Sequence, residues 1–205
     1  MPSPSTTTPP ADSEFDPLVF WIQHKTKIVL LILILLVGFG TFGISEWVRT
    51  TREDSAKALF ASANSLDGYR KVIAEYPSSA PAASAYLLVA EKLRQDGKYD
   101  ESTKELQTFL QKFPQHQLVS GAWTSIAANQ EAQGKTDEAL GTYQKVSTAY
   151  ANSFSAPLAL MAQARILEAK GKTEDARRIY EQVMTQYRDN MAAQQAAMEI
   201  RKLKK

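Results

Sequence analysis

Paired carboxylates beside single glycines are the residues of this sequence whose types and spacing could carry chemistry. Acidic pairs occur at Asp100-Glu101, Asp137-Glu138 and Glu174-Asp175, and each pair closely follows a Gly-Lys dipeptide. Two carboxylates can act as general acid and base, and a glycine-lysine loop can hold a phosphate. The copies lie 37 residues apart, however, and an active site is not expected three times in one chain. The repetition therefore favours a structural role.

Other catalytic and metal-binding patterns are missing from the sequence. It contains no cysteine, and its two histidines are His24 and His116. A zinc-thiolate site, a disulfide framework and a cysteine nucleophile are excluded by this composition. We find no pattern of a catalytic triad, an H-E-x-x-H motif or a glycine-rich phosphate loop. We therefore expect no enzyme, no cofactor and no metal. The net charge of +2 also argues against a nucleic-acid partner.

The acidic pairs belong to a longer repeat, which predicts an array of helical hairpins. A fixed period of 37 residues is typical of stacked supersecondary units. Three full repeats cover residues 80–190: repeat 1 is 80–116, repeat 2 is 117–153 and repeat 3 is 154–190. Each is expected to form helix A, a glycine turn and helix B. We see no β-strand pattern, so the predicted fold is all-α.

Repeat 1 shows how the residue types define the hairpin. Gly97 is expected to end helix A in the left-handed conformation, and Asp100 and Glu101 to open helix B, where carboxylates offset the helix dipole. Phe113-Pro114 should close helix B, whereas the later repeats have Ala151 and Arg188 in place of the proline, so looser helix ends are expected there. The apolar positions of repeat 1 are Tyr86, Val89, Ala90, Leu93, Leu106, Phe109 and Leu110.

This pattern resembles the tetratricopeptide repeat. The matching positions in repeat 1 are Tyr86, Ala90, Gly97, Ser102, Leu106 and Pro114, and they recur in register. The resemblance implies an α-solenoid whose A helices line a concave groove for other proteins. The groove positions that it implies are Leu87, Glu91, Arg94, Thr124, Ala128, Glu131, Leu158, Met161, Arg165 and Glu168.

The N-terminal region predicts a membrane anchor. Residues 28–45 carry no charge, and a helix of this length spans about 27 Å, close to the ~30 Å hydrocarbon core of a bilayer. Residues 1–14 are rich in proline, serine and threonine and predict a disordered tail, and residues 15–27 a juxtamembrane segment. A cleaved signal peptide and a buried core helix are the alternatives, and a good signal-cleavage site is lacking.

The predicted membrane helix leaves two matters open. Gly38, Gly40 and Gly43 offer a packing face through which copies of the chain could form an oligomer. The lysine and arginine residues near the span slightly oppose an N-terminus on the cytoplasmic side, but a long domain can cross the membrane regardless of charge, so the orientation stays open. Residues 46–79 are expected to form a linker helix and a degenerate first repeat, and residues 191–205 a capping helix with a polar outer side.

The whole arrangement is similar to the ancillary subunit family of the bacterial secretion translocon. That resemblance implies a single-pass protein of the inner membrane with its repeats in the periplasm. It also implies partners in the translocon or among periplasmic chaperones. The expected function is a membrane-anchored scaffold for protein–protein interaction. An envelope assembly or cell-division factor is the alternative, followed by a cytoplasm-facing adaptor.

Overall fold

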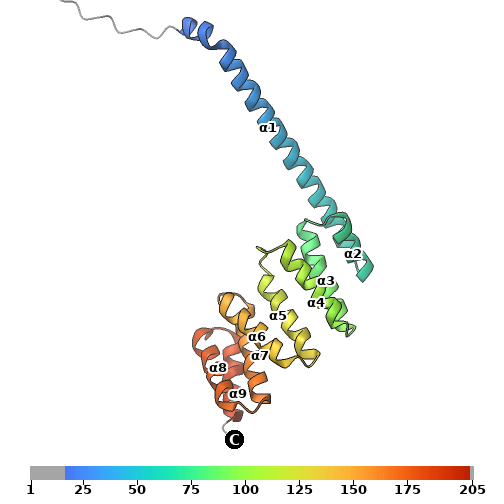
Figure 1. Ribbon diagram of the computed structural model, residues 1–205, viewed down its shortest axis with the longest axis vertical. Helices are drawn as coiled ribbons and strands as arrows, with labels where there is room; N and C mark the ends of the chain where they lie inside the picture. The colour runs from blue at the N-terminus through green and yellow to red at the C-terminus, as the bar shows by residue number, and fades with distance from the viewer. Residues whose placement is uncertain (1–16, 204–205) are drawn as a thin grey trace, which may run out of the picture. The chain divides into compact units, whose positions relative to one another are not determined.

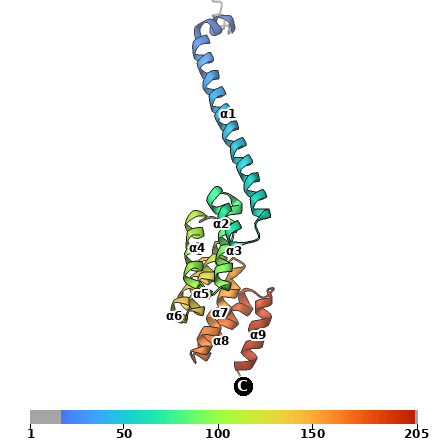
Figure 2. The ribbon, with the colours of Figure 1, turned by 90° about the vertical axis from the view of Figure 1, so that its right-hand side faces the viewer.

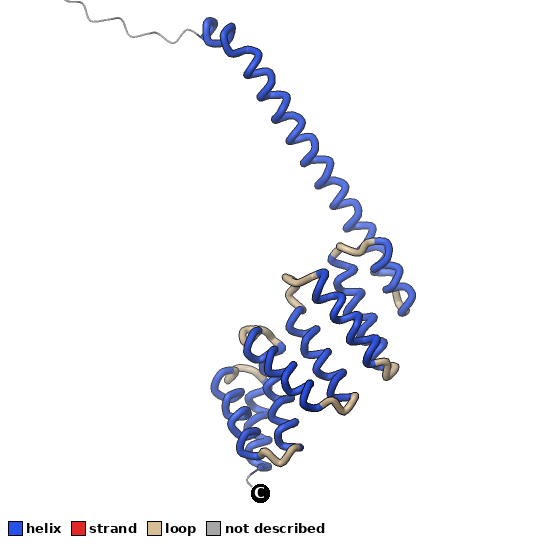
Figure 3. The backbone as a smooth tube through the Cα atoms, in the orientation of Figure 1, coloured by secondary structure: helices blue, strands red, loops and turns tan. Residues whose placement is uncertain are grey.

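The computed structural model describes residues 17–203, apart from the side chains at residues 37 and 39–44. Within this range the regular structure is helical, as Figure 3 shows, so the all-α prediction is confirmed. The chain divides into an N-terminal part, residues 1–51, and a repeat part, residues 52–205. The tail expected over residues 1–14 lies outside the described residues.

The N-terminal part is dominated by helix α1 (Pro17–Ser62), which continues into the repeat part. Its stretch Pro17–Leu36 has 20 residues and a mean hydropathy of 1.8, and none of it is buried. By length and composition this stretch could cross a membrane, and a signal sequence has the same properties. It begins earlier than the predicted span 28–45. Most side chains at the end of that span lie outside the described residues.

The repeat part consists of helices that follow one another in space as they do in sequence (Figures 1 and 2). The A helices of repeats 1 to 3 are α3, α5 and α7, and their B helices are α4, α6 and α8. The bounds are α2 Leu66–Glu75, α3 Ala80–Gln95, α4 Tyr99–Lys112, α5 Val119–Ala132, α6 Thr136–Ala149, α7 Ser155–Ala169, α8 Thr173–Gln186 and α9 Met191–Leu203.

Contacts between repeats are closer on the side of the A helices. Besides packing on its neighbours in sequence, α7 contacts both α5 and α9 across the intervening B helices. Helix α9 begins at Met191, which is 37 residues after Phe154, so α9 takes the place of a fourth A helix. The A helices therefore lie on the inner, concave side of the array, as in other solenoids.

The glycine turn has the same hydrogen bonds in all three repeats. Gly97, Gly134 and Gly171 have φ angles of 74°, 74° and 73°, as predicted for helix C-termini. At the first turn, the Lys98 N–H donates to the Leu93 carbonyl at 2.8 Å, and the Gly97 N–H donates to the Arg94 carbonyl at 3.0 Å. This pair of bonds is the Schellman motif, which satisfies the last helix carbonyls and reverses the chain.

Small side chains let helices A and B of one hairpin come close together. Ser102 is fully buried against α3, and its Oγ donates a hydrogen bond to the Ala90 carbonyl at 2.7 Å. Ala139 and Ala176 take the same place in repeats 2 and 3 and are also fully buried. A larger side chain at this position would push the two helices apart.

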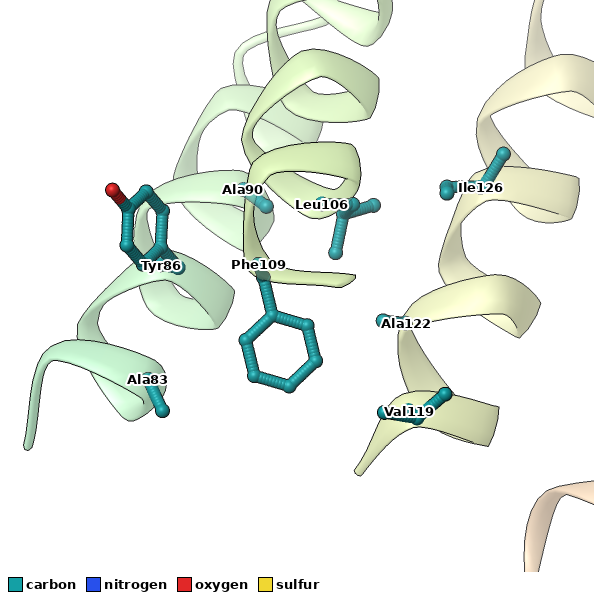
Figure 4. Packing of buried hydrophobic residues seen from close by; sticks show 8 residues of the cluster. All are labelled: Ala83, Tyr86, Ala90, Leu106, Phe109, Val119, Ala122 and Ile126. Atoms are coloured by element: carbon teal, nitrogen blue, oxygen red, sulfur yellow. The ribbon is translucent and has the colours of Figure 1, made fainter. Parts of the chain in front are cut away.

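Larger side chains fill the space between one hairpin and the next. Figure 4 shows Leu106 and Phe109 of α4 between α3 and α5, where Leu106 points toward Ile126 and the Phe109 ring lies nearer Ala122 and Val119. Phe109 is fully buried, and burying such a side chain stabilises the fold by about 1.5–3 kcal/mol. The predicted apolar positions thus form the core of repeat 1 and its junction with repeat 2.

Helix B ends at the same repeat position with or without proline. Helices α4, α6 and α8 end at Lys112, Ala149 and Gln186, so the expectation of looser ends in repeats 2 and 3 is wrong. The next residue is always aromatic, and its N–H still bonds the carbonyl four residues earlier. The aromatic ring packs on the hydrophobic core, which fixes the point where the chain leaves the helix. These residues are Phe113, Tyr150 and Tyr187.

Replacing the turn glycine should therefore destabilise the fold because of its left-handed backbone conformation alone. An added Cβ at Gly134 would meet nothing within 4 Å. We expect Gly134→Ala to lower the free energy of unfolding by about 1–2 kcal/mol, the cost of a left-handed residue with a Cβ. The measurement is urea denaturation of the full chain in detergent, followed by circular dichroism.

Gly141→Ala is the matched control for this change. Gly141 lies inside α6, and an added Cβ there would also meet open space. Because alanine favours the helix, Gly141→Ala should raise the free energy of unfolding by about 0.5–1 kcal/mol. Equal effects of the two substitutions would contradict the role given to the turn.

Candidate protein-binding groove

The predicted groove residues of repeats 1 and 3 line two separate hollows on the concave side. Leu87, Glu91 and Arg94 of α3 line a hollow of about 180 Å³ together with residues of α4 and α5. A second hollow, of about 720 Å³, lies between α7 and α9. Its lining includes all four groove positions predicted in repeat 3, which are Leu158, Met161, Arg165 and Glu168. Whether these residues bind a partner stays a prediction.

The groove positions of repeat 2 lie on α5, outside the lining of both hollows. Thr124 and Ala128 are half-buried on α5, and the Thr124 hydroxyl donates to the Ser120 carbonyl of its own helix. Glu131 has a different role, because it binds Arg165 of repeat 3 through both carboxylate oxygens at 2.6 and 2.9 Å. The hydrogen bond to Glu131 raises the pKa of Arg165 above its usual value. The sequence predicted both residues but not their pairing.

The small hollow in repeat 1 is neutral. Arg94 and Glu91 lie one turn apart on α3, with Nε–Oε2 and Nη2–Oε1 distances of 3.0 and 2.9 Å. Gln95 also donates to Glu91, at 2.9 Å. The two charges therefore neutralise each other within one helix, and little charge is left for a ligand.

The large hollow between α7 and α9 carries more acid than base. Glu199 of α9 pairs with Lys202 at 2.9 Å, and Arg165 is held by Glu131. Glu168 forms no ion pair within the described part of the chain, and it accepts a hydrogen bond from the Tyr180 hydroxyl at 3.3 Å. Burial, followed by the charges of Glu168 and Glu199, raises the pKa of Tyr180 to about 12.

Several residues of the large hollow were missed as groove positions. Tyr180 was not among the predicted groove positions, and residues 191–205 were expected only as a cap. Gln195 and Glu199 of α9 nevertheless line the hollow. The repeat register could have found Gln195, because it lies 37 residues after Leu158. The capping helix therefore also supplies part of the concave surface.

The acidic residues at the glycine turns contact the next repeat. Asp100 accepts a hydrogen bond from Gln133 Nε2 at 2.8 Å, and Asp137 pairs with Lys170 at the equivalent place one repeat later. The hydrogen bond and charge of Lys170 lower the pKa of Asp137. These carboxylates thus link neighbouring repeats at the surface, in addition to opening helix B.

The comparison with protein families decides the assignment of the fold. A model described as a tetratricopeptide repeat-like domain matches residues 19–205. The chain belongs to this family. The resemblance seen in the repeat residues is thereby confirmed, and the fold is one that commonly serves as a non-catalytic scaffold for protein–protein interaction.

Two solved structures with TPR-like repeats are similar to this chain at low sequence identity. Two crystal structures from Podosopora anserina, described as putative kinesin light chain with nearly identical TPR-like repeats, are 17% identical to this chain, each with a TM-score of 0.48. They cover 59% and 60% of this chain, which spans 64% and 65% of theirs, less than two thirds. No curated protein matches the sequence.

The tyrosines that face groove carboxylates should make the fold sensitive to alkali. Burial and then the charge of Glu131 raise the pKa of Tyr143 to about 12, against an ordinary value of 10.0. Well below pH 10, the Tyr143 hydroxyl keeps its proton in both the folded and the unfolded chain. Between about pH 10 and 12 the unfolded chain loses it first, so the free energy of unfolding falls as pH rises, by up to about 1.4 kcal/mol per pH unit for each such tyrosine.

Tyr143→Phe removes this proton and should flatten the dependence on pH. The measurement is urea denaturation of the full chain and the variant at a series of pH values from 7 to 12. We expect similar stability at pH 7, because the hydroxyl makes only a long hydrogen bond to Glu131, 3.4 Å. If the free energy of unfolding depends on pH in the same way in both proteins, Tyr143 is not the titrating group.

Proposed function

We propose that the chain is a membrane-anchored scaffold that binds other proteins on the concave face of its repeats. The observation that carries this proposal is the exposure of two large apolar side chains one helical turn apart, of which Leu158 lines the large hollow. Phe154 and Leu158 are 59% and 54% exposed, although both belong to the segment that builds an A helix. Apolar side chains gathered on a concave surface favour a protein ligand, since such groupings commonly mark interaction sites.

The apolar stretch of α1 supports the membrane part of the proposal. We propose that the span 28–45, together with the apolar residues before it, crosses the inner membrane once. The charged residues that follow in α1, such as Arg49, Arg52 and Glu53, would then lie in water. Copies of the chain could associate through this helix. A removed signal sequence is the competing explanation, and the size of the mature chain in the membrane fraction distinguishes them.

The combination of an apolar helix and a repeat array supports a role in the envelope or in protein secretion. Under this proposal the repeats lie in the periplasm and bind the secretion translocon, its clients or periplasmic chaperones. Digestion of residues 46–205 by protease added to spheroplasts would support this placement, and protection would contradict it. An envelope assembly or cell-division factor is the alternative, and it differs in the partner rather than in the binding surface.

Site-specific photo-cross-linking tests the concave face directly. A photoreactive amino acid replaces Met161 on α7, and Thr185 on the B helix α8 serves as the control position. We expect Met161 to give adducts with one or a few recurrent proteins in intact cells, at several times the yield of Thr185. Adducts that form mainly from Thr185 would show that partners bind elsewhere.

A further inference from the structure

The two hollows of the concave face differ in charge, and this difference points to one kind of ligand. In the small hollow the Glu91–Arg94 pair leaves no net charge. The charged residues that line the large hollow, counted with their ion-pair partners, comprise two cations, Arg165 and Lys202, and three carboxylates. These carboxylates are Glu131, Glu168 and Glu199. The large hollow therefore has an excess of one negative charge, and Glu168 is the carboxylate without a cation among the described residues.

The acidic and apolar residues of the large hollow lie at different levels along α7. Leu158 and Met161 are in the first half of the helix, and Glu168 is close to its end. Seven residues separate Met161 from Glu168, which corresponds to about 10 Å along the helix axis. In an extended chain, side chains at positions i and i+2 point the same way and are about 7 Å apart. A long arginine or lysine side chain can span the difference between this spacing and the distance from Met161 to Glu168.

We infer that the hollow between α7 and α9 binds an extended segment of a partner protein in which a basic side chain stands two residues from a large apolar one. The apolar side chain packs on Leu158 and Met161, and the basic group pairs with Glu168 and Glu199. This inference rests on the proposed scaffold function and adds the chemistry of the ligand. The tetratricopeptide fold alone would not specify it, because the corresponding hollow in repeat 1 is neutral.

The positions of the two carboxylates support a basic ligand. Glu168, Glu199 and Tyr180 all line the hollow, and the Tyr180 hydroxyl donates to Glu168, so both carboxylates face the same space. Arg165 does not cancel them, because Glu131 holds it from the side of α5. A cation in the hollow would also reduce the repulsion between Glu168 and Glu199, which an acidic ligand would increase.

Fluorescence anisotropy with defined peptides tests this inference. The probe is a fluorescein-labelled peptide, Ala-Ala-Phe-Ala-Arg-Ala-Ala, titrated with the full chain in detergent micelles. We expect saturable binding, which Glu168→Gln combined with Glu199→Gln weakens about three- to tenfold, as expected for two partly exposed ion pairs. Glutamine keeps an acceptor for the Tyr180 hydroxyl, and circular dichroism checks that the variant is folded.

Control peptides and variants show whether a loss of affinity comes from the removed charges or from another effect of the substitutions. A probe with glutamine in place of arginine should bind more weakly to the unchanged chain and be insensitive to the double variant. Glu174→Gln on α8, outside the hollow, should leave the affinity for the arginine probe unchanged. Equal affinity of the unchanged chain and the double variant, or no binding of the probe, would overturn the ligand chemistry. Adducts from Met161 would still support the scaffold function in that case.

Discussion

The left-handed turn at the end of each A helix is the constraint on which the rest of the structure depends. Gly97, Gly134 and Gly171 reverse the chain with the same hydrogen bonds and nearly the same φ. Helix B therefore starts at the same place in each repeat, and its small residue meets helix A where the backbones can approach closely. Without this fixed reversal, the apolar residues of successive hairpins would not come into register.

The contacts between repeats are built from three kinds of interaction. Apolar side chains such as Phe109 fill the interior, and surface carboxylates such as Asp137 link the turns. On the concave side, the pair Glu131–Arg165 joins α5 to α7. Each interaction connects only neighbours, which is how a solenoid distributes its stability along the chain. The same arrangement leaves the groove positions of the A helices available to a ligand.

The repeat architecture could be predicted from the sequence because its signals recur. The glycine turns, the alanine positions and the aromatic residues after helix B all repeat at 37 residues, so each supports the others. The groove could be predicted only as a set of positions. Pairing between Glu131 and Arg165 depends on how far α5 lies from α7, and this distance is fixed by packing rather than by local sequence. The contribution of α9 was missed because a capping helix was expected to end the surface instead of extending it.

Methionine oxidation gives the most direct measurement of whether the concave face is occupied. Met161 lines the large hollow on α7, whereas Met184 lies on the B helix α8 and is 38% exposed. Hydroxyl-radical footprinting of the full chain in intact cells and after purification in detergent gives the ratio of oxidation at the two residues. If partners bind the concave face, Met161 is protected relative to Met184 in cells and becomes reactive after purification. A ratio that is unchanged, or protection of Met184 instead of Met161, would contradict this account.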